Sequence, residues 1–335
     1  MEMARKTTLY AKYNGKILSN AAKSLVESFQ YTDVASGESD SIEVTLNNRN
    51  LQFMKNMPKK GDRITANIIR HNWIKSGTRK TLKCGKFILD DLSFSEPPRT
   101  CTIGAVSIPA KGEFKTRKRT KTYKNVTLQE IARTIAQRAG IALHYDAFKI
   151  TIKEIEQSKT PDSEFLLSLC SEYGLGIKIY NGKIVIFNEE NYEKKAAKAV
   201  LWRNKGTMIS WDWNTTLQGT YTGARVSYTV PSDSNTHHVS IGKKGRMLEV
   251  DVTAFSKNDA ILKAKAKLAE ENKKRTTATL TIFPPDKPVI ATDTIRLKGF
   301  YKLSGKYYVD KVEHSVSSGG YTQTITVHKV SPRIS

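Results

Sequence analysis

Hydrophobic residues along this chain follow two periods, one typical of strands and one typical of helices. Apolar and polar positions alternate strictly over residues 42–46 and again over residues 248–252. This period of two predicts half-buried β-strands. Turn sequences such as Asn14-Gly15 and Gly319-Gly320 separate many short segments of this kind. Short strands joined by turns are typical of a barrel or a sandwich.

A helical period interrupts this pattern near the middle of the chain. Thr127 precedes an apolar run and Glu130 follows three positions later, which is the signature of a capping box. Gly140 is positioned to end the helix, and the alternating residues 141–146 predict a strand after it. The apolar positions of the predicted helix have helical spacing and would form one face: Leu128, Ile131, Ala132, Ile135 and Ala136.

A second helix–glycine–strand unit follows the first. Phe165, Leu169 and Cys170 lie on one face of a predicted helix that ends near Gly174. Asn181-Gly182 then predicts a β-hairpin. The two units together indicate a small α+β domain whose helices cover a short sheet, and this is favoured over a ligand pocket.

One further helix is predicted near the C-terminus, over residues 256–275. Ser256 and Asp259 would cap its start, and its apolar stripe is narrow: Ile261, Ala264 and Leu268. Its Lys-rich opposite face could bind an anionic or membrane surface. The stripe is too weakly hydrophobic for a membrane anchor, so the helix is expected to lie across a barrel.

The pattern therefore predicts a mainly β chain of the α+β type with three domains. Residues 1–112 form one β domain, residues 113–198 the α+β domain, and residues 199–335 a second β domain with one long helix. Two β domains of similar size in one chain suggest a duplicated barrel.

The net charge of the chain indicates what kinds of partner it could bind. The chain has 55 Lys and Arg against 32 Asp and Glu, for a formal net charge of +23. Such a surplus is typical of proteins that meet nucleic acid, membrane headgroups or acidic protein surfaces. The densest basic run, KTRKRTK, supplies the candidate partner-binding residues: Lys115, Arg117, Lys118, Arg119 and Lys121. A solvated linker between domains, or a loop that pairs with acidic residues of a neighbouring subunit, is the favoured interpretation of the same run, because single charge runs are common.

The three cysteines are odd in number and lack CxxC spacing, which argues against a disulfide framework or a zinc site and suits a reducing cytoplasm. No apolar run is long enough to span a bilayer. The first ten residues contain no apolar signal-peptide core. The chain is expected to be neither inserted into a membrane nor exported by a standard signal.

Catalytic signatures are missing from the sequence. The six histidines form no HExxH pair, and GxSxG, P-loop and dinucleotide-binding patterns do not occur. His237-His238 could catch a metal incidentally, but a flexible loop is the expected structure there. The acidic pairs Asp90-Asp91 and Glu189-Glu190 are expected to solvate turns next to strand ends. The sequence thus predicts no catalytic residues, no cofactor and no metal site.

Several stretches, taken in order, resemble the baseplate hub proteins of contractile phage tails and tailocins, a family that includes the late control gene D protein and the hub half of type VI secretion spikes. These stretches include SFQYTDVASGESDSIEVTLNN, MPKKGDRITANI, CGKFILDDLSFSEPP, YKNVTLQEIARTIAQRAGIALHYD, TPDSEFLLSLCSEYGLGI and GKYYVDKVEHSVSSGGYTQTITVHKV. The positions that carry the resemblance include Asp33, Gly37, Asp40, Pro58, Gly61, Asp62, Pro97, Pro98, Tyr308, Val309, His314 and Gly320.

The resemblance implies two barrels related to the tail-tube fold, with the α+β domain inserted between them. It implies a homotrimer whose six barrels form a pseudo-sixfold ring around a channel, joining the sixfold tail tube to the threefold central spike. Its partners would be the tube protein, the spike protein and the tape measure protein, with transient DNA contact in the channel. The protein would belong to a virion or tailocin particle assembled in the bacterial cytoplasm.

Two other functions remain open from the residues alone. A DNA-binding protein would use the basic run and the Lys-rich helix. A cell-wall-degrading tail enzyme is less favoured, because the chain ends soon after the second β domain and leaves no room for a fused hydrolase.

Overall fold

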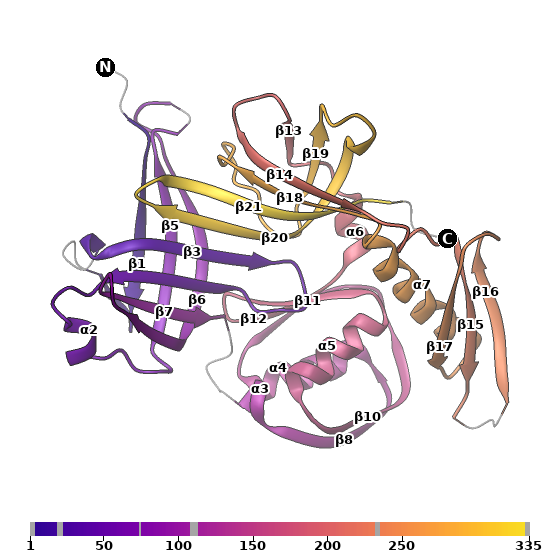
Figure 1. Ribbon diagram of the computed structural model, residues 1–335. Coiled ribbons are helices and arrows are strands. Elements are labelled where there is room, and N and C mark those ends of the chain that lie inside the picture. The colour runs from indigo at the N-terminus through magenta and orange to yellow at the C-terminus, as the bar shows by residue number, and fades with distance from the viewer. Residues whose placement is uncertain (1–3, 19–22, 74, 108–112, 232–234, 332–335) are drawn as a thin grey trace.

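The computed structural model describes residues 4–18, 23–73, 75–107, 113–231 and 235–331. These residues form three packed parts: a large β-sheet, an α+β domain below it, and a small sheet with one long helix at its side (Figure 1). The chain is mainly β and of the α+β type, as the sequence predicts.

The largest sheet contains strands from both predicted β domains. Within the described residues it has thirteen strands, and its main path runs β14-β18-β21-β20-β3-β4-β7-β6-β5-β1-β2. No strand pairing among those residues closes either half into a barrel. Its strands are β1 (Lys6–Tyr13), β2 (Lys16–Ile17), β3 (Val26–Val34), β4 (Ser41–Asn47), β5 (Arg63–His71), β6 (Arg79–Ser95), β7 (Thr100–Val106), β13 (Ala199–Trp202), β14 (Met208–Thr215), β18 (Thr276–Ile282), β19 (Thr294–Lys298), β20 (Gly305–Ser317) and β21 (Gly320–Lys329).

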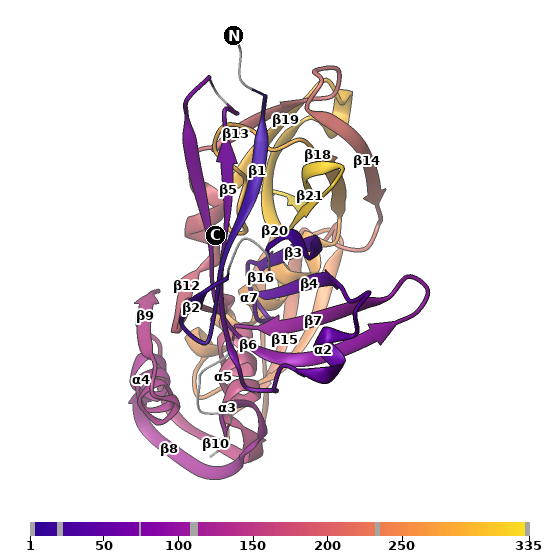
Figure 2. The same cartoon turned by 90° about the vertical axis from the view of Figure 1, so that its left-hand side faces the viewer.

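The sheet has two lobes, each with its own hydrophobic core, and the β20–β21 hairpin belongs to both. The first lobe comprises β1–β7, and its core includes Phe29, Ile103 and, from the hairpin, Tyr321. The second lobe comprises β13, β14, β18 and β19, and its core includes Ile325 and Val327 from the same hairpin. β20 pairs with β3 over Ser28–Val34, which joins the lobes into one sheet (Figure 2).

The α+β domain follows the two predicted helix–strand units closely. Thr127 accepts from the Glu130 amide and Glu130 from the Thr127 amide, so the capping box is confirmed. Gly140 ends the helix with φ 67°, and Asn181-Gly182 turns between two paired strands. The elements are α3 (Glu113–Thr116), β8 (Lys118–Thr127), α4 (Leu128–Ala139), β9 (Ala142–Asp146), β10 (Thr151–Pro161), α5 (Asp162–Glu172), β11 (Leu175–Tyr180), β12 (Lys183–Asn188) and α6 (Glu189–Lys194).

The long C-terminal helix packs against a separate sheet, so the expectation that it lies across a barrel is wrong. α7 (Lys257–Lys273) starts at Ser256, whose side chain accepts from the Asp259 amide. Its buried residues share a core with β15 (Gly223–Thr229), β16 (Thr236–Gly242) and β17 (Met247–Thr253). These strands have the order β16-β15-β17 and do not join the large sheet among the described residues.

Two local expectations are also corrected. His237 and His238 lie on β16, paired with β15, rather than in a flexible loop. Asp90 and Asp91 lie within β6, where the register shifts, rather than next to a strand end. The remaining described elements are short: α2 (Gln52–Lys55) and a 3₁₀ turn η1 (Tyr301–Leu303).

Candidate functional site

The predicted basic segment is mostly ordered secondary structure rather than a linker or loop. Lys115 lies in α3, Lys118, Arg119 and Lys121 lie on β8, and Arg117 stands between these elements. β8 pairs with β10 along its whole length, which a polar sequence without alternation did not reveal. The longer basic stretch that contains this segment, Lys111 to Lys124, begins at a residue outside the described ranges.

The arginines of this segment are held by carboxylates of the same chain. Arg117 donates to Glu113 at 2.9 Å, and Arg119 contacts Glu113 at 3.2 Å and Asp162 at 3.4 Å. The Lys121 ammonium lies 4.8 Å from the ring centre of Tyr123. Lys115 and Lys118 are exposed, and no carboxylate in the described part of the chain pairs with either. The structure therefore does not gather the five predicted residues into one free cationic site.

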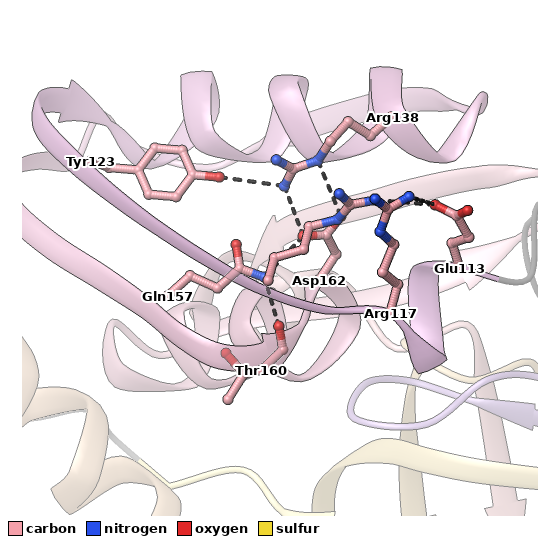
Figure 3. Close-up of polar contacts among 8 residues, drawn as sticks. Glu113, Arg117, Tyr123, Arg138, Gln157, Thr160 and Asp162 are labelled. Carbon is pink, nitrogen blue, oxygen red and sulfur yellow. Dashed lines mark hydrogen bonds and ion pairs between the residues drawn. The ribbon is translucent and has the colours of Figure 1, made fainter.

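Asp162 explains why Arg119 points inward. Its carboxylate is buried at the start of α5 and accepts two hydrogen bonds from Arg138, at 2.7 and 3.1 Å. Gln157 donates to it at 2.9 Å (Figure 3). A buried carboxylate needs this many donors to offset its lost hydration. This cluster holds β8, β10, α4 and α5 together.

A buried ion pair joins the α+β domain to the large sheet. Lys178 of β11 lies 2.7 Å from Asp33 and 3.2 Å from Asp40. Asp33 also accepts from the Ala291 amide at 2.9 Å, and Asp40 accepts from the Val34 amide at 3.1 Å. Asp33 and Asp40 are two of the positions that carry the family resemblance, and their lysine partner stands in the apolar stretch GIKIY of β11.

Backbone contacts reinforce this interdomain ion pair. The Ser36 hydroxyl accepts from the Ile177 amide at 2.9 Å, and the Gly37 amide donates to the Ile177 carbonyl at 3.2 Å. Burial raises the pKa of Asp40 to about 6, and the nearby Lys178 ammonium opposes this rise. The β3–β4 turn is therefore fixed to β11 by charge and by backbone together.

A second buried charge cluster fixes α6 between the domains. His328 of β21 lies 2.8 Å from Asp310 through Nδ1 and 3.4 Å from Glu193 through Nε2. Burial lowers the pKa of His328, but the two carboxylates outweigh this and raise it to about 9. Glu189 contacts Lys273 of α7, so Glu189 is buried and paired rather than solvating a turn.

One face of the large sheet carries few cations where seven neighbouring strands pair with one another, although exposed Lys86 of β6 continues this face beyond the β6–β7 pairing. Opposite the buried side chains, the exposed and half-buried positions of seven neighbouring strands alternate with the core and lie in register across the sheet. We call these positions the polar face. They are Ser28, Gln30, Thr32, Ser41, Glu43, Thr45, Asn47, Ile88, Asp91, Ser93, Ser95, Thr100, Thr102, Gly104, Val106, Thr277, Thr279, Thr281, Lys311, Glu313, Ser315, Ser317, Thr322, Thr324 and Thr326.

The register shows that the polar face crosses both lobes. In one row, Thr281 lies opposite Thr324, Thr324 opposite Glu313, and Glu313 opposite Thr32. In the next row, Gln30 lies opposite Glu43 and Glu43 opposite Gly104. The face is therefore one continuous surface, and most of its side chains are short and polar, with serine and threonine the commonest.

Aromatic side chains are exposed on β13 and β14 of the second lobe. Trp202 of β13 has the ammonium groups of Lys205 and Lys298 at 5.1 and 5.0 Å from its ring. The Arg203 guanidinium lies 5.6 Å from the ring of Trp211. These exposed rings and cations form a surface suited to protein contact.

The described residues contain few clusters of side chains that could bind a metal or react. Within the described residues, no group of three His, Cys, Asp or Glu side chains could hold a metal ion. The cysteines Cys84, Cys101 and Cys170 are all free and buried. None of the described helices is long and apolar enough to cross a membrane.

The comparisons identify the fold. No protein-family model and no curated protein matches the chain. Among solved structures, the 43 kDa tail protein of prophage MuSo2 from Shewanella oneidensis is similar with a TM-score of 0.72 and 14% identity, covering 97% of this chain and 98% of that protein. The tail protein of Neisseria meningitidis MC58 has a TM-score of 0.72 and 11% identity, with 96% of each chain covered.

A type VI secretion component is also similar. The Escherichia coli c3393 protein, which shows structural similarity to the T4 bacteriophage tail proteins gp27 and gp5, matches with a TM-score of 0.58 and 11% identity, covering 92% of this chain and 74% of that one. At these identities the likeness concerns the fold. The chain therefore has a phage-tail-protein fold, which a type VI secretion component shares.

Proposed function

We propose that this chain is a structural baseplate hub: a homotrimeric adaptor that joins a sixfold tail tube to a threefold central spike around a channel. The observation that carries the proposal is the match of its fold, over 97% of this chain, with a solved tail protein whose chain is covered over 98% of its length. The match includes the α+β domain and the small sheet as well as both lobes, so it is not a likeness to one common module.

The two-lobed sheet suits such an adaptor. Each chain offers two β lobes joined by the β20–β21 hairpin. Three copies would present six lobes to a sixfold tube and three equivalent surfaces to a threefold spike. Closed cyclic symmetry of this kind is how most soluble homo-oligomers assemble. The buried charge clusters at Lys178 and His328 would keep the lobes and the α+β domain in fixed orientation.

The proposed partners are the tail tube protein, the central spike protein and the tape measure protein, in a virion or tailocin particle assembled in the bacterial cytoplasm. The exposed Trp202 and Trp211 with their neighbouring cations support protein partners. We propose a role without catalysis, which an assay for peptidoglycan hydrolysis by the purified chain would test.

The alternative of a DNA-binding protein acting through the basic segment has less support. Arg119 is held against the buried Asp162, and Arg117 pairs with Glu113 at the surface, so part of the charge of the segment is already offset within the chain. Duplex binding through this segment would weaken steeply with salt and would be lost in a Lys115→Glu, Lys118→Glu variant.

Electron microscopy of the purified chain, alone and mixed with tube and spike proteins, tests the hub proposal. The expected particles are rings with threefold symmetry and a central hole, or co-assemblies with the tube protein. A chain that stays monomeric with both partners present would contradict the proposal.

A further inference from the structure

We propose that the outer surface of β13 and β19, with the two loops next to these strands, binds an extended acidic segment of another polypeptide. The two strands pair with each other in the upper part of the second lobe (Figure 1). We call their outer surface, together with the β13–β14 loop and η1, the cation–aromatic surface. The inference goes beyond the proposed function, because it gives the chemistry and the spacing of a partner segment and does not depend on assembly into a ring.

The first argument is unbalanced positive charge. Residues 199–211 and 294–309 together contain six Lys and Arg and no Asp or Glu: Arg203, Lys205, Arg296, Lys298, Lys302 and Lys306. In the part of the chain that the structure describes, none of the six forms an ion pair with a carboxylate. The acidic residue that precedes β19, Asp293, is already paired with Lys198 at 2.8 Å. The surface therefore attracts an anionic partner.

The second argument is the arrangement of the cations. Arg296 and Lys306 lie directly opposite each other in the pairing of β19 with β20, and like charges in this position repel. Burial and the neighbouring Arg296 lower the pKa of Lys306, and Glu193 only partly opposes this. Carboxylates brought by a partner would relieve the repulsion.

The same arrangement defines a spacing for the partner. Arg296 and Lys298 are two residues apart and exposed, so both lie on one face of β19. Two residues of a strand span about 7 Å. An extended polypeptide with carboxylates at every second residue has the same repeat, and it can place one carboxylate on each cation.

The third argument is an aromatic anchor among the cations. Val200 and Trp202 are 47% and 38% exposed, and in the β13–β19 pairing they lie opposite Arg296 and Lys298. The ammonium groups of Lys205 and Lys298 lie 5.1 and 5.0 Å from the Trp202 ring. An apolar side chain packed on this ring would bring the carboxylates beside it to both ammonium groups. Exposed aromatic residues of this kind are frequent binding hot spots.

The loop after β19 adds a second exposed ring. Tyr301 is 85% exposed and has φ 50°, in the left-handed region that bulky residues rarely adopt. Such strain is found at binding sites, where the surrounding structure holds it. Tyr301 follows Phe300, whose ring is 5.7 Å from that of Trp211. The loop is therefore fixed to β14 while Tyr301 itself stays exposed to a partner.

A polypeptide fits the cation–aromatic surface better than nucleic acid or a lipid headgroup does. Among the described strands β13 pairs with β19 alone, so its other edge is open. An extended polypeptide can hydrogen-bond to such an edge through its main chain. Phosphate groups cannot form this ladder, and the exposed aliphatic side chains of Val200 and Ile209 suit a polypeptide side chain.

A synthetic peptide tests the proposal on the purified chain. The probe is a fluorescein-labelled peptide in which Glu and Thr alternate and one central Glu is replaced by Ile, so that its carboxylates and its apolar anchor share one face. The control peptide has the same composition but places its Glu residues in adjacent pairs, which turns half of the carboxylates away. Fluorescence polarisation measures both affinities. We expect the alternating peptide to bind about fivefold more tightly than the paired one, and both to weaken as salt rises.

Matched charge reversals locate the site. Arg296→Glu, Lys298→Glu removes the paired contacts, and we expect it to weaken binding of the alternating peptide by about tenfold or more. Lys243→Glu, Lys244→Glu makes the same change in net charge at an exposed turn of the small sheet and should change binding far less. Trp202→Ala should also weaken binding, and it should abolish the preference for the peptide with Ile over one with Gly at that position. Thermal unfolding checks that each variant folds.

Each other result would overturn the inference. Equal affinities in the two double variants, or no preference for the alternating peptide, would show that only the net charge of the chain attracts the probe. Tighter binding of a DNA oligonucleotide or of phosphatidylserine vesicles, lost in Arg296→Glu, Lys298→Glu, would assign the surface to a phosphate-bearing partner. Self-association of the chain that Trp202→Ala abolishes would assign it to a second copy. Ring formation, which tests the proposed function, is measured separately, so either proposal can fail while the other stands.

Discussion

Single residues hold the domains of this protein together, and Lys178 is the clearest case. Its side chain is 10% exposed, and its ammonium contacts two carboxylates, those of Asp33 and Asp40, which are 6% and 0% exposed. Burial of two like charges without a cation would be very unfavourable. The contact of Lys178 with the two aspartates is therefore needed for the α+β domain to pack against the large sheet.

Removing Lys178 should destabilise the protein strongly. We expect Lys178→Ala to lower the free energy of unfolding by about 3–5 kcal/mol, because it leaves two buried carboxylates without a cation. Urea unfolding followed by circular dichroism measures the change. Lys124→Ala is the matched control, since Lys124 pairs with Glu154 on the surface, and it should cost about 0–1 kcal/mol. Equal losses in the two variants would contradict the role given to Lys178.

His328 should make stability depend on pH in the alkaline range. Its folded pKa of about 9 lies above the ordinary value of 6.5, so its contribution is complete below about pH 6.5 and is lost as pH rises through 9. The difference corresponds to about 3 kcal/mol. Unfolding free energies measured across this range should fall in the wild type, and the part of the fall due to His328 should be missing in His328→Gln. The same slope in both proteins would refute this assignment.

At the scale of elements, the sequence predicted helices whose ends are defined by contacts within a few residues. It did not predict strands that form only by pairing with distant segments. Thr127, Glu130 and Gly140 define α4 through contacts within a few residues, so the sequence revealed this helix and its ends. Strand β8 has no alternation and becomes a strand only because β10 pairs with it. His237 and His238 are ordered for the same reason, by pairing with β15.

The candidate site was harder to predict than the elements. The basic segment is conspicuous in the sequence, yet its arginines serve the α+β domain. The polar face consists of common residues such as Thr102 and Thr324, and only the register across the strands brings them together. A useful sequence signal would have been the scarcity of lysine at the outward positions of consecutive strands in a chain of net charge +23.

The small sheet depends on Gly223, the first residue of β15. The chain that connects β16 to β17 passes close to this glycine. An added Cβ at Gly223 would lie 2.4 Å from the Ile241 carbonyl oxygen and 3.0 Å from that of Lys243. Both are backbone atoms that side-chain rotation cannot move. The connection lies close to the start of β15 because the Thr222 amide donates to the Arg246 carbonyl and the Thr222 carbonyl accepts from the Lys243 amide.

We therefore expect Gly223→Ala to destabilise the small sheet, by at least about 1–3 kcal/mol as for other overpacked sites. Limited proteolysis and thermal unfolding should both show the loss. Gly206→Ala is the control, because no atom lies within 4 Å of its added Cβ and its φ is not in the left-handed region. The control should be neutral or slightly stabilising. Unchanged protease resistance in Gly223→Ala would show that the crossing can relax.

At the scale of the whole molecule, the β20–β21 hairpin makes two lobes into one folding unit. Tyr321 lies in the core of the first lobe, and Ile325, four residues later, lies in the core of the second. β20 meanwhile pairs with β3 of the first lobe. A substitution that destabilises either core should therefore destabilise the other as well, which would not be expected in a chain of two independent barrels.

Ile325→Ala tests this coupling. Ile325 is fully buried, so the substitution should cost about 2–5 kcal/mol. Amide hydrogen exchange under conditions of global opening should show the same loss of protection in β4 of the first lobe and in β18 of the second. Val226→Ala is the control, because Val226 is buried in the core of the small sheet and its effect should be strongest there. If Ile325→Ala leaves β4 fully protected, the lobes open independently, and the fixed lobe geometry that an adaptor between unlike symmetries requires would have to come from the assembly rather than from the chain itself.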